Sequence, residues 1–172
     1  SGNTITQSQE EFVNATLERF DMLEARPCPT PGLPDDKLVP SPPSDNEEEL
    51  ADRETIKNVY NAAAGCLMWL SYGTRPELCA TVRNICRFMQ DPSRPHWRAV
   101  KRVMRYLKGT ADQVITFRKD TEHALTLSAY ADASFVGDPG INHSMGGYAI
   151  FLGSNPTFWS SKKKEKPDAL SS

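Results

Sequence analysis

Six cations lie on one side of a predicted helix over residues 94–107, the last of them one residue past its end, and their types and spacing suit phosphate binding. They are Arg94, Arg98, Lys101, Arg102, Arg105 and Lys108. No acidic residue occurs between positions 93 and 110. Arg and Lys side chains supply contacts to phosphates that do not depend on base sequence. The pattern favours a nucleic-acid-binding face, and the alternative is a solvated face paired with the acidic run at 47–54.

A single carboxylate, that of Asp132, stands at the end of a predicted strand, in the string Tyr130-Ala131-Asp132-Ala133-Ser134. A carboxylate in that position is well placed to bind a divalent metal ion, which prefers oxygen ligands. The simpler interpretation is an aspartate that begins a turn, because Asp and Gly favour turns. The residues alone favour the turn.

Composition indicates the class of protein. The 172 residues suit a single domain, and a formal net charge of −2 gives no global attraction to a polyanion. Cysteines stand at 28, 66, 79 and 86 without a C-x-x-C pair, which predicts buried free thiols in a reducing compartment and argues against zinc. No apolar run approaches the ~20 residues of a membrane span, and no signal peptide opens the sequence. We expect an intracellular protein of the cytoplasm or nucleus, neither secreted nor membrane-bound.

The elements that must position these residues follow from hydrophobic spacing. Helices are predicted at about 9–23, with Ser8 as N-cap, and at 53–73, 76–89 and 94–107. Seven prolines between positions 27 and 44 predict an extended linker, followed by an acidic run that is a solvated face or a helix N-terminus. Strands are predicted at 3–7, 114–118, 125–131, 145–152 and 157–160, the last two joined by a turn at 153–156. Helices followed by a small antiparallel sheet indicate an α+β fold.

Several strings, in order, resemble the Pol polyproteins of copia-type LTR retrotransposons. ITQSQEEFVNATLERFDM resembles the segment after the polymerase palm. GCLMWLSYGTRPEL resembles the family's G-S-L-M-Y-L…T-R-P-D-I, and FMQDPSRPHWRAVKRVMRYLKGT its stretch ending K-R-V-L-R-Y-L-K-G-T. LSAYADASFVGD, SMGGYAIFLGSNPTFWSSKKK and ALSS resemble the first strands of its RNase H domain. The resemblance covers nearly all of the chain outside the proline-rich segment.

The resemblance implies four parts and a partial RNase H-like fold. Residues 1–26 correspond to the end of the reverse transcriptase palm and the start of the thumb, and 27–52 to a proline-rich and acidic linker. Residues 53–110 correspond to a helical thumb/connection-like unit, and 111–172 to the first half of an RNase H-like domain. The region of the six cations contacts the template–primer duplex in the resembled family.

The resemblance also implies an incomplete catalytic site. Asp132 matches the first metal ligand of RNase H, which works with two metal ions held by several carboxylates. The family's polymerase aspartates would precede residue 1, and its next RNase H glutamate, in T-E-A-E-Y, would follow residue 172. The family often has Asp where this chain has Ser134. We therefore expect no cofactor for this chain alone, with Mg²⁺ in the intact family enzyme, and no RNase H activity from these residues.

Two functions follow as expectations. The first is a fragment or domesticated remnant of a reverse transcriptase/RNase H that is inactive alone and binds RNA–DNA hybrid. The alternative is a non-catalytic structural or assembly module. In it, a protein partner covers the apolar side chains of the incomplete sheet, which we expect at Leu125, Leu127, Tyr148, Ile150, Phe151, Phe158 and Trp159.

Overall fold

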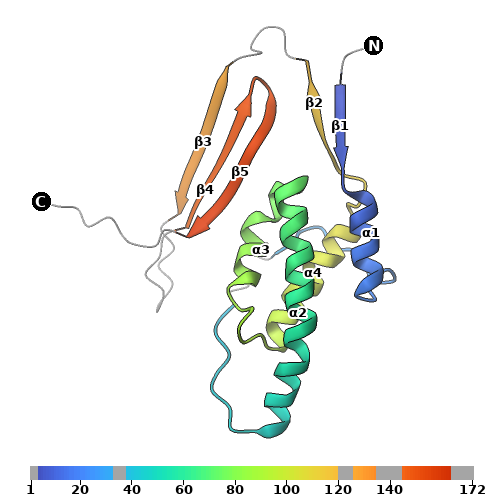
Figure 1. Ribbon diagram of the computed structural model, residues 1–172, viewed down its shortest axis with the longest axis vertical. Coiled ribbons are helices and arrows are strands. Elements are labelled where there is room, and N and C mark those ends of the chain that lie inside the picture. Colours follow the sequence, from blue (N-terminus) through green and yellow to red (C-terminus); the bar gives the residue numbers. More distant parts are fainter. Residues whose placement is uncertain (1–3, 33–37, 120–125, 135–144, 164–172) are drawn as a thin grey trace, which may run out of the picture. The chain divides into compact units, whose positions relative to one another are not determined.

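The computed structural model describes residues 4–32, 38–119, 126–134 and 145–163 (Figure 1). Its described residues fall into two compact units. The helical unit runs from Ser8 to Val114, and the sheet unit consists of Thr4 to Gln7 and the described residues from Ile115 onward. Helices fill the first and strands the second, so the predicted α+β class is confirmed.

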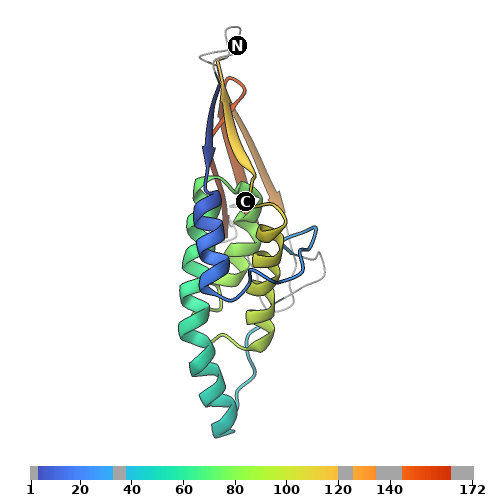
Figure 2. The same cartoon turned by 90° about the vertical axis from the view of Figure 1, so that its right-hand side faces the viewer.

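The helical unit is built around one long helix, α2 (Glu47–Gly73). Against it pack α1 (Glu10–Arg19), the short 3₁₀ turn η1 (Pro76–Leu78), α3 (Cys79–Cys86) and α4 (Arg94–Lys108) (Figures 1 and 2). The core is formed by the apolar faces of these helices, among them Val13, Leu17, Tyr60, Leu67, Leu70, Leu78, Ile85, Val100, Met104 and Leu107. This core fixes the orientation of α4, which carries the six cations.

Helix α2 begins at Glu47, six residues before Arg53. The predicted start was Arg53, because the hydrophobic spacing begins there. The side chain of Asn46 caps it, accepting hydrogen bonds from the backbone N–H groups of Glu48 (2.9 Å) and Glu49 (3.3 Å). Three glutamates in the first turn suit the positive end of the helix dipole. The acidic run is therefore a helix N-terminus, one of the two alternatives that the sequence left open.

Two other predicted helices are shorter in the structure. Helix α1 has Gln9 rather than Ser8 at its N-cap, although the Ser8 hydroxyl still accepts a bond from the N–H of Glu10 (3.1 Å). It ends at Arg19 because Asp21, with a φ of 55°, adopts the left-handed conformation that stops a helix. The helix predicted at 76–89 divides into η1 and α3 and ends at Cys86.

The sheet unit contains two small sheets. Strand β1 (Thr4–Ser8) pairs with β2 (Val114–Arg118). Strands β3 (Leu127–Ser134), β4 (Met145–Leu152) and β5 (Asn155–Lys163) form an antiparallel sheet in that order. Only Gly153 and Ser154 join β4 to β5, and Gly153 has a φ of 60°, so β5 starts earlier than the predicted four-residue turn allowed.

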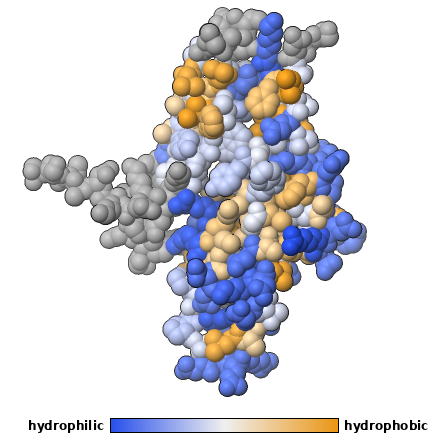
Figure 3. Space-filling view, viewed as in Figure 1, coloured by the Kyte–Doolittle hydropathy of each residue, from blue (hydrophilic) through white to orange (hydrophobic). Residues whose placement is uncertain are grey.

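Large apolar side chains of the three-stranded sheet are exposed. Leu127 is 70% exposed, Tyr130 67% and Phe158 64%, and Tyr148 is also exposed. Ile150, Phe151 and Trp159 are half-buried, and Leu125 lies outside the described residues. Figure 3 shows hydrophobic side chains in orange on the surface of this unit. The sheet therefore presents apolar area to its surroundings, as expected from the sequence.

Candidate nucleic-acid interface

Helix α4 is amphipathic, and its buried side fixes where its cations lie. Val100, Val103, Met104 and Leu107 are buried in the core of the helical unit. At its start, Ser93 and His96 form a capping box, and Pro95 stands in the first turn. All six predicted cations lie on this helix, with Arg94, Arg98 and Lys101 exposed and Arg102, Arg105 and Lys108 half-buried. These six residues are called the basic face below.

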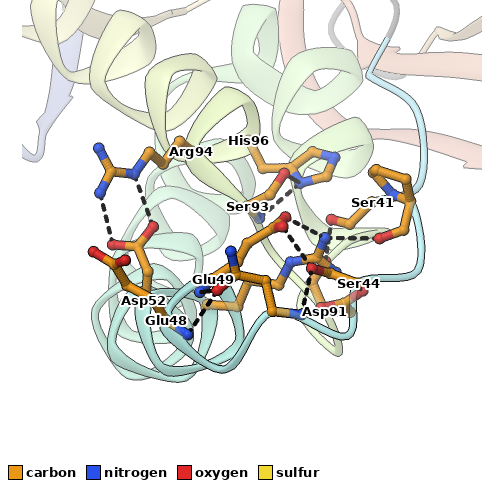
Figure 4. Close-up of polar contacts among 12 residues, drawn as sticks. Ser41, Ser44, Glu48, Glu49, Asp52, Asp91, Ser93, Arg94 and His96 are labelled. Atoms are coloured by element: carbon orange, nitrogen blue, oxygen red, sulfur yellow. Dashed lines mark hydrogen bonds and ion pairs between the residues drawn. The ribbon is translucent and has the colours of Figure 1, made fainter.

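Arg94, at the start of the basic face, is paired with an acid. Its Nε and Nη2 atoms donate to the two carboxylate oxygens of Asp52, at 2.8 and 3.0 Å (Figure 4). The hydrogen bonds from Arg94 lower the pKa of the Asp52 carboxyl. Asp52 belongs to the acidic first half of α2, so the alternative of pairing with the acidic run is realised at this one cation.

Arg102 and Arg105 hold the segment of residues 26–32, called the strap below, against α4. Arg102 Nη2 donates to Thr30 Oγ1 at 2.9 Å, and Arg105 Nε donates to the Arg26 carbonyl at 2.6 Å. Cys28 adds two bonds in the other direction, from its N–H to the Arg105 carbonyl and from its thiol to the Arg102 carbonyl. Every acceptor on the strap is a neutral oxygen, so neither guanidinium is neutralised.

The other three cations are available for a ligand. Within the described part of the chain, Arg98, Lys101 and Lys108 have no ion pair and no side-chain hydrogen bond. The ammonium of Lys101 lies 5.6 Å from the centre of the Trp97 ring, which holds it without removing its charge. Spacings of three and seven residues place all three on one side of the helix.

His96 connects α4 to the proline-rich segment and is buried. Its Nδ1 accepts a hydrogen bond from the Ser93 N–H at 3.0 Å, which leaves Nε2 as the donor to the Val39 carbonyl at 2.9 Å. The imidazole stacks on Phe88, with ring centres 4.1 Å apart. Burial lowers the pKa of His96; the Arg53 charge acts in the same direction, whereas the bond to Val39 and the Asp91 charge oppose it.

We expect this arrangement to make the helical unit less stable in acid. The unfolded histidine has a pKa of about 6.5, and the folded one titrates lower, so its contribution is complete above pH ~6.5 and is lost as pH falls through the folded pKa. Urea unfolding followed by circular dichroism at pH 7.5, 6 and 5 measures the loss. His96→Gln should cost about 1 kcal/mol at pH 7.5 and flatten the pH dependence. If the stability of this variant depends on pH as steeply as that of the unchanged chain, the pH dependence belongs to groups other than His96.

Asp132 lies near the end of β3, with an exposed side chain, paired in register with Gly147 of β4. Among the described residues, no three His, Cys, Asp or Glu side chains form a group that could hold a metal ion. The side chain of Ser134 lies outside the described part of the chain. The four cysteines are free thiols, half-buried rather than fully buried as predicted.

Two features of the helical unit were missed from the sequence. One is the strap, whose contacts join residues 72 to 79 positions apart. The other is an exposed aromatic pair on α2, Trp69 and Tyr72, with Met68 beside them. The sequence contained a signal for their exposure, because Trp69 and Tyr72 lie outside the helical repeat to which the buried Leu67 and Leu70 belong. Aromatic side chains exposed in this way are suited to contacts with a ligand.

None of the helices in the described part of the chain combines the length and the hydrophobicity needed to cross a membrane. No protein-family model and no solved structure matches the chain.

Similar proteins are found among the Pol polyproteins of plant transposons. The chain is 37% identical over 158 residues to the retrovirus-related Pol polyprotein from transposon RE2 of Arabidopsis thaliana, which covers 92% of the chain and 10% of that protein. It is 33% identical over 155 residues to the corresponding polyprotein from transposon TNT 1-94 of Nicotiana tabacum, covering 90% of the chain and 11% of that protein. The chain thus spans about a tenth of the length of these relatives.

A shorter relative is covered more completely. The secreted RxLR effector protein 161 of Plasmopara viticola is 39% identical over 118 residues, which are 68% of this chain and 81% of that protein.

Proposed function

Because the chain belongs to the copia-type retrovirus-related Pol polyproteins of transposons, we propose that it is part of their reverse transcriptase–RNase H region and binds RNA–DNA hybrid. Residues 1–26 and 53–110 supply the end of the palm and the thumb/connection-like helices, joined by residues 27–52. Residues 111–172 supply part of an RNase H-like sheet. The polyprotein's activities belong to its whole length, and this segment contributes binding rather than catalysis.

The observation that carries the proposal is the state of the basic face on α4. Arg98, Lys101 and Lys108 project from one side of a helix that the core holds in place, and no acid in the described residues pairs with them. Their charges act without the cost of breaking an existing ion pair. A rigid row of cations of this kind binds the phosphate backbone of a duplex regardless of base sequence.

Binding of the 172-residue chain to a short RNA–DNA hybrid is expected to weaken steeply with salt. Each phosphate contact contributes about −0.9 to the slope of log K against log salt, so the three available cations give a slope of roughly −3. All six cations would have given roughly −5, but Arg94 is paired with Asp52 and two arginines hold the strap. Fluorescence anisotropy with labelled hybrid between 50 and 300 mM NaCl measures the slope.

A slope near zero, or no binding at 50 mM NaCl, would reject the basic face as a duplex-binding surface. Binding of duplex DNA with a similar slope, and of single-stranded RNA with a shallower slope of about −0.7 per contact, would support backbone recognition, because phosphates are common to all three.

Catalysis is not part of the proposed role. Asp132 is one carboxylate, and hydrolysis with two metal ions needs several. We propose that Mg²⁺ acts in the intact family enzyme and not at the described residues of this segment.

The exposed sheet supports a second candidate, a structural or assembly module. Leu127, Tyr130 and Phe158 are each more than 60% exposed, and burying such side chains is worth about 1.5–3 kcal/mol each. A protein partner that covers the β3-β4-β5 sheet would recover this free energy. Sedimentation at micromolar concentration distinguishes the two candidate functions. An assembly module is expected to associate through its sheet, whereas hybrid binding through α4 does not require a protein partner.

A further inference from the structure

We propose that Thr30 is a phosphorylation site, that Arg102 holds its phosphate, and that the phosphate weakens nucleic-acid binding by α4. The effect on nucleic-acid binding rests on the proposed function. The strap would then be a regulated cover of the basic face. The inference follows from the dipeptide in which Thr30 stands, from its exposure, and from the side chain that its hydroxyl already meets.

Thr30 meets the requirements of a substrate. It is followed by Pro31, and the chain contains one other Ser/Thr-Pro dipeptide, Ser41-Pro42. The Thr30 residue is exposed, and its hydroxyl oxygen accepts a bond from Arg102 Nη2 at 2.9 Å. Residues 25–32 contain no acid, so nothing in the strap itself opposes an added negative charge.

Ser41 provides a built-in comparison. Its hydroxyl donates to the Asp91 carbonyl at 3.2 Å, so it meets a backbone oxygen instead of a cation. A little further along the same segment, Ser44 donates to the Glu49 carboxylate at 2.6 Å. A phosphate at Ser41 or Ser44 would face an acceptor oxygen, and the two groups would repel each other. A phosphate at Thr30 would instead face a guanidinium, which attracts it.

The modification is an ordinary phosphoryl transfer from ATP by a proline-directed serine/threonine kinase. The Thr30 hydroxyl oxygen forms a bond to the γ-phosphorus, the bond from that phosphorus to ADP breaks, and the hydroxyl proton passes to the kinase's base. The product carries a charge of about −1.5 to −2 at pH 7 and three strong acceptor oxygens. Arg102 can then donate to an anion in place of a neutral hydroxyl, which is a stronger bond.

Two consequences are expected. The strap is held more tightly, because it is already attached to α4 at two other points: the Arg26 carbonyl accepts from the Arg105 side chain, and the Cys28 N–H donates to the Arg105 carbonyl. The charge on the basic face falls, because the phosphate lies beside Arg102, within one helical turn of Arg98 and Arg105. Arg98 is one of the three available cations, and a phosphate within one turn of it competes with the duplex for its charge. In 0.1 M salt, removing one cation–phosphate interaction lowers affinity about eightfold.

The test uses the full chain with Ser41→Ala, so that Thr30-Pro31 is the single Ser/Thr-Pro dipeptide left. The protein is incubated with a purified proline-directed kinase and Mg–ATP, and peptide mapping by mass spectrometry locates the phosphate. We expect modification of Thr30 and a rise in Tm of about 3–5 °C. The Kd for RNA–DNA hybrid in 0.1 M NaCl should rise about eightfold or more. Thr30→Val with Ser41→Ala should take up no phosphate and show neither change.

Arg102→Ala separates the proposed contact from a general effect of charge. In this variant, phosphorylation of Thr30 should leave Tm unchanged. Failure of the kinase to modify Thr30, an equal rise in Tm in Arg102→Ala, or an unchanged Kd after full modification each overturns the inference. If the unmodified chain does not bind hybrid at all, the proposed function fails, and the Tm comparison alone still decides whether Arg102 holds the phosphate.

Discussion

A chain in which Arg98, Lys101 and Lys108 are all changed to Glu is expected to bind RNA–DNA hybrid at least 100-fold more weakly in 0.1 M NaCl. Removing one cation–phosphate interaction lowers affinity about eightfold at this salt concentration, and removing three together lowers it about 500-fold. The carboxylates also repel the phosphates, whereas incomplete phosphate binding by any one cation reduces the effect. Anisotropy with the hybrid used for the salt titration measures the change directly.

The choice of these three residues comes from the structure. From the sequence, all six cations were equivalent, and a reversal of Arg102 or Arg105 would have seemed as informative. Both arginines hold the strap through Thr30 and the Arg26 carbonyl, so their reversal would combine the removal of a charge with a detached segment. Arg98 and Lys101 are exposed, and Lys108 is half-buried, so their replacement should leave the fold intact, as circular dichroism can verify.

A matched control separates the basic face from net charge. Arg19, Arg87 and Lys119 are also exposed cations of the described chain, and none of them lies on α4. Changing all three to Glu alters the formal charge by the same −6. We expect a loss of less than tenfold from this control. If both triple variants lose affinity equally, attraction by overall charge, with no defined face, accounts for the binding.

The sequence predicted most of the elements because their signals are local. Strands at 114–118 and 145–152 were predicted with the bounds that the structure has, since alternation marks the first and the turn that begins at Gly153 ends the second. The helix at 94–107 was predicted to within one residue, because apolar spacing and a following glycine set its length. The start of α2 was placed six residues late because an asparagine cap and three consecutive glutamates, rather than a repeating apolar pattern, begin the helix.

The candidate site was predicted less well, because its state depends on distant contacts. The positions of the six cations were evident from the sequence. Which of them stay available was not, since Arg94 meets an acid 42 positions away and Arg102 a threonine 72 positions away. The proline-rich segment predicted to be an extended linker also supplies the carbonyl of Val39 to His96. A proline-rich segment forms no regular hydrogen-bonded structure, because prolines lack N–H donors. Its backbone carbonyls, such as that of Val39, therefore remain free to accept from donors elsewhere in the fold.

Replacement of Arg75 by Met is expected to have the largest effect on stability, about 3 kcal/mol. The Arg75 residue is 1% exposed. Its Nε donates to Glu77 at 2.7 Å and its Nη1 to the Thr110 carbonyl at 3.0 Å, while Nη2 donates to the Thr110 hydroxyl. The guanidinium also lies over the Tyr106 ring, 5.5 Å from its centre. It therefore joins the end of α2 to the residues that follow α4.

Methionine keeps much of the apolar stem but removes every donor, so the loss comes from polar groups left without partners. The Thr110 carbonyl loses a donor in a half-buried position, and Glu77 loses the cation it pairs with. A loss of about 3 kcal/mol lowers Tm by about 10 °C or more in a unit of this size. Differential scanning calorimetry gives Tm, and urea unfolding at pH 7.5 gives the free energy.

Two further variants test the reason for the loss. Arg75→Lys keeps the charge but cannot donate to Glu77 and both Thr110 oxygens at once, so it should recover only part of the stability. Arg98→Met removes an exposed arginine of α4 and should cost less than about 0.5 kcal/mol. Equal losses for Arg75→Met and Arg98→Met would show that Arg75 is not a structural tie. Full recovery of stability by Arg75→Lys would assign the role of Arg75 to its charge alone. It would contradict the importance of the forked guanidinium, whose three nitrogens each donate a hydrogen bond.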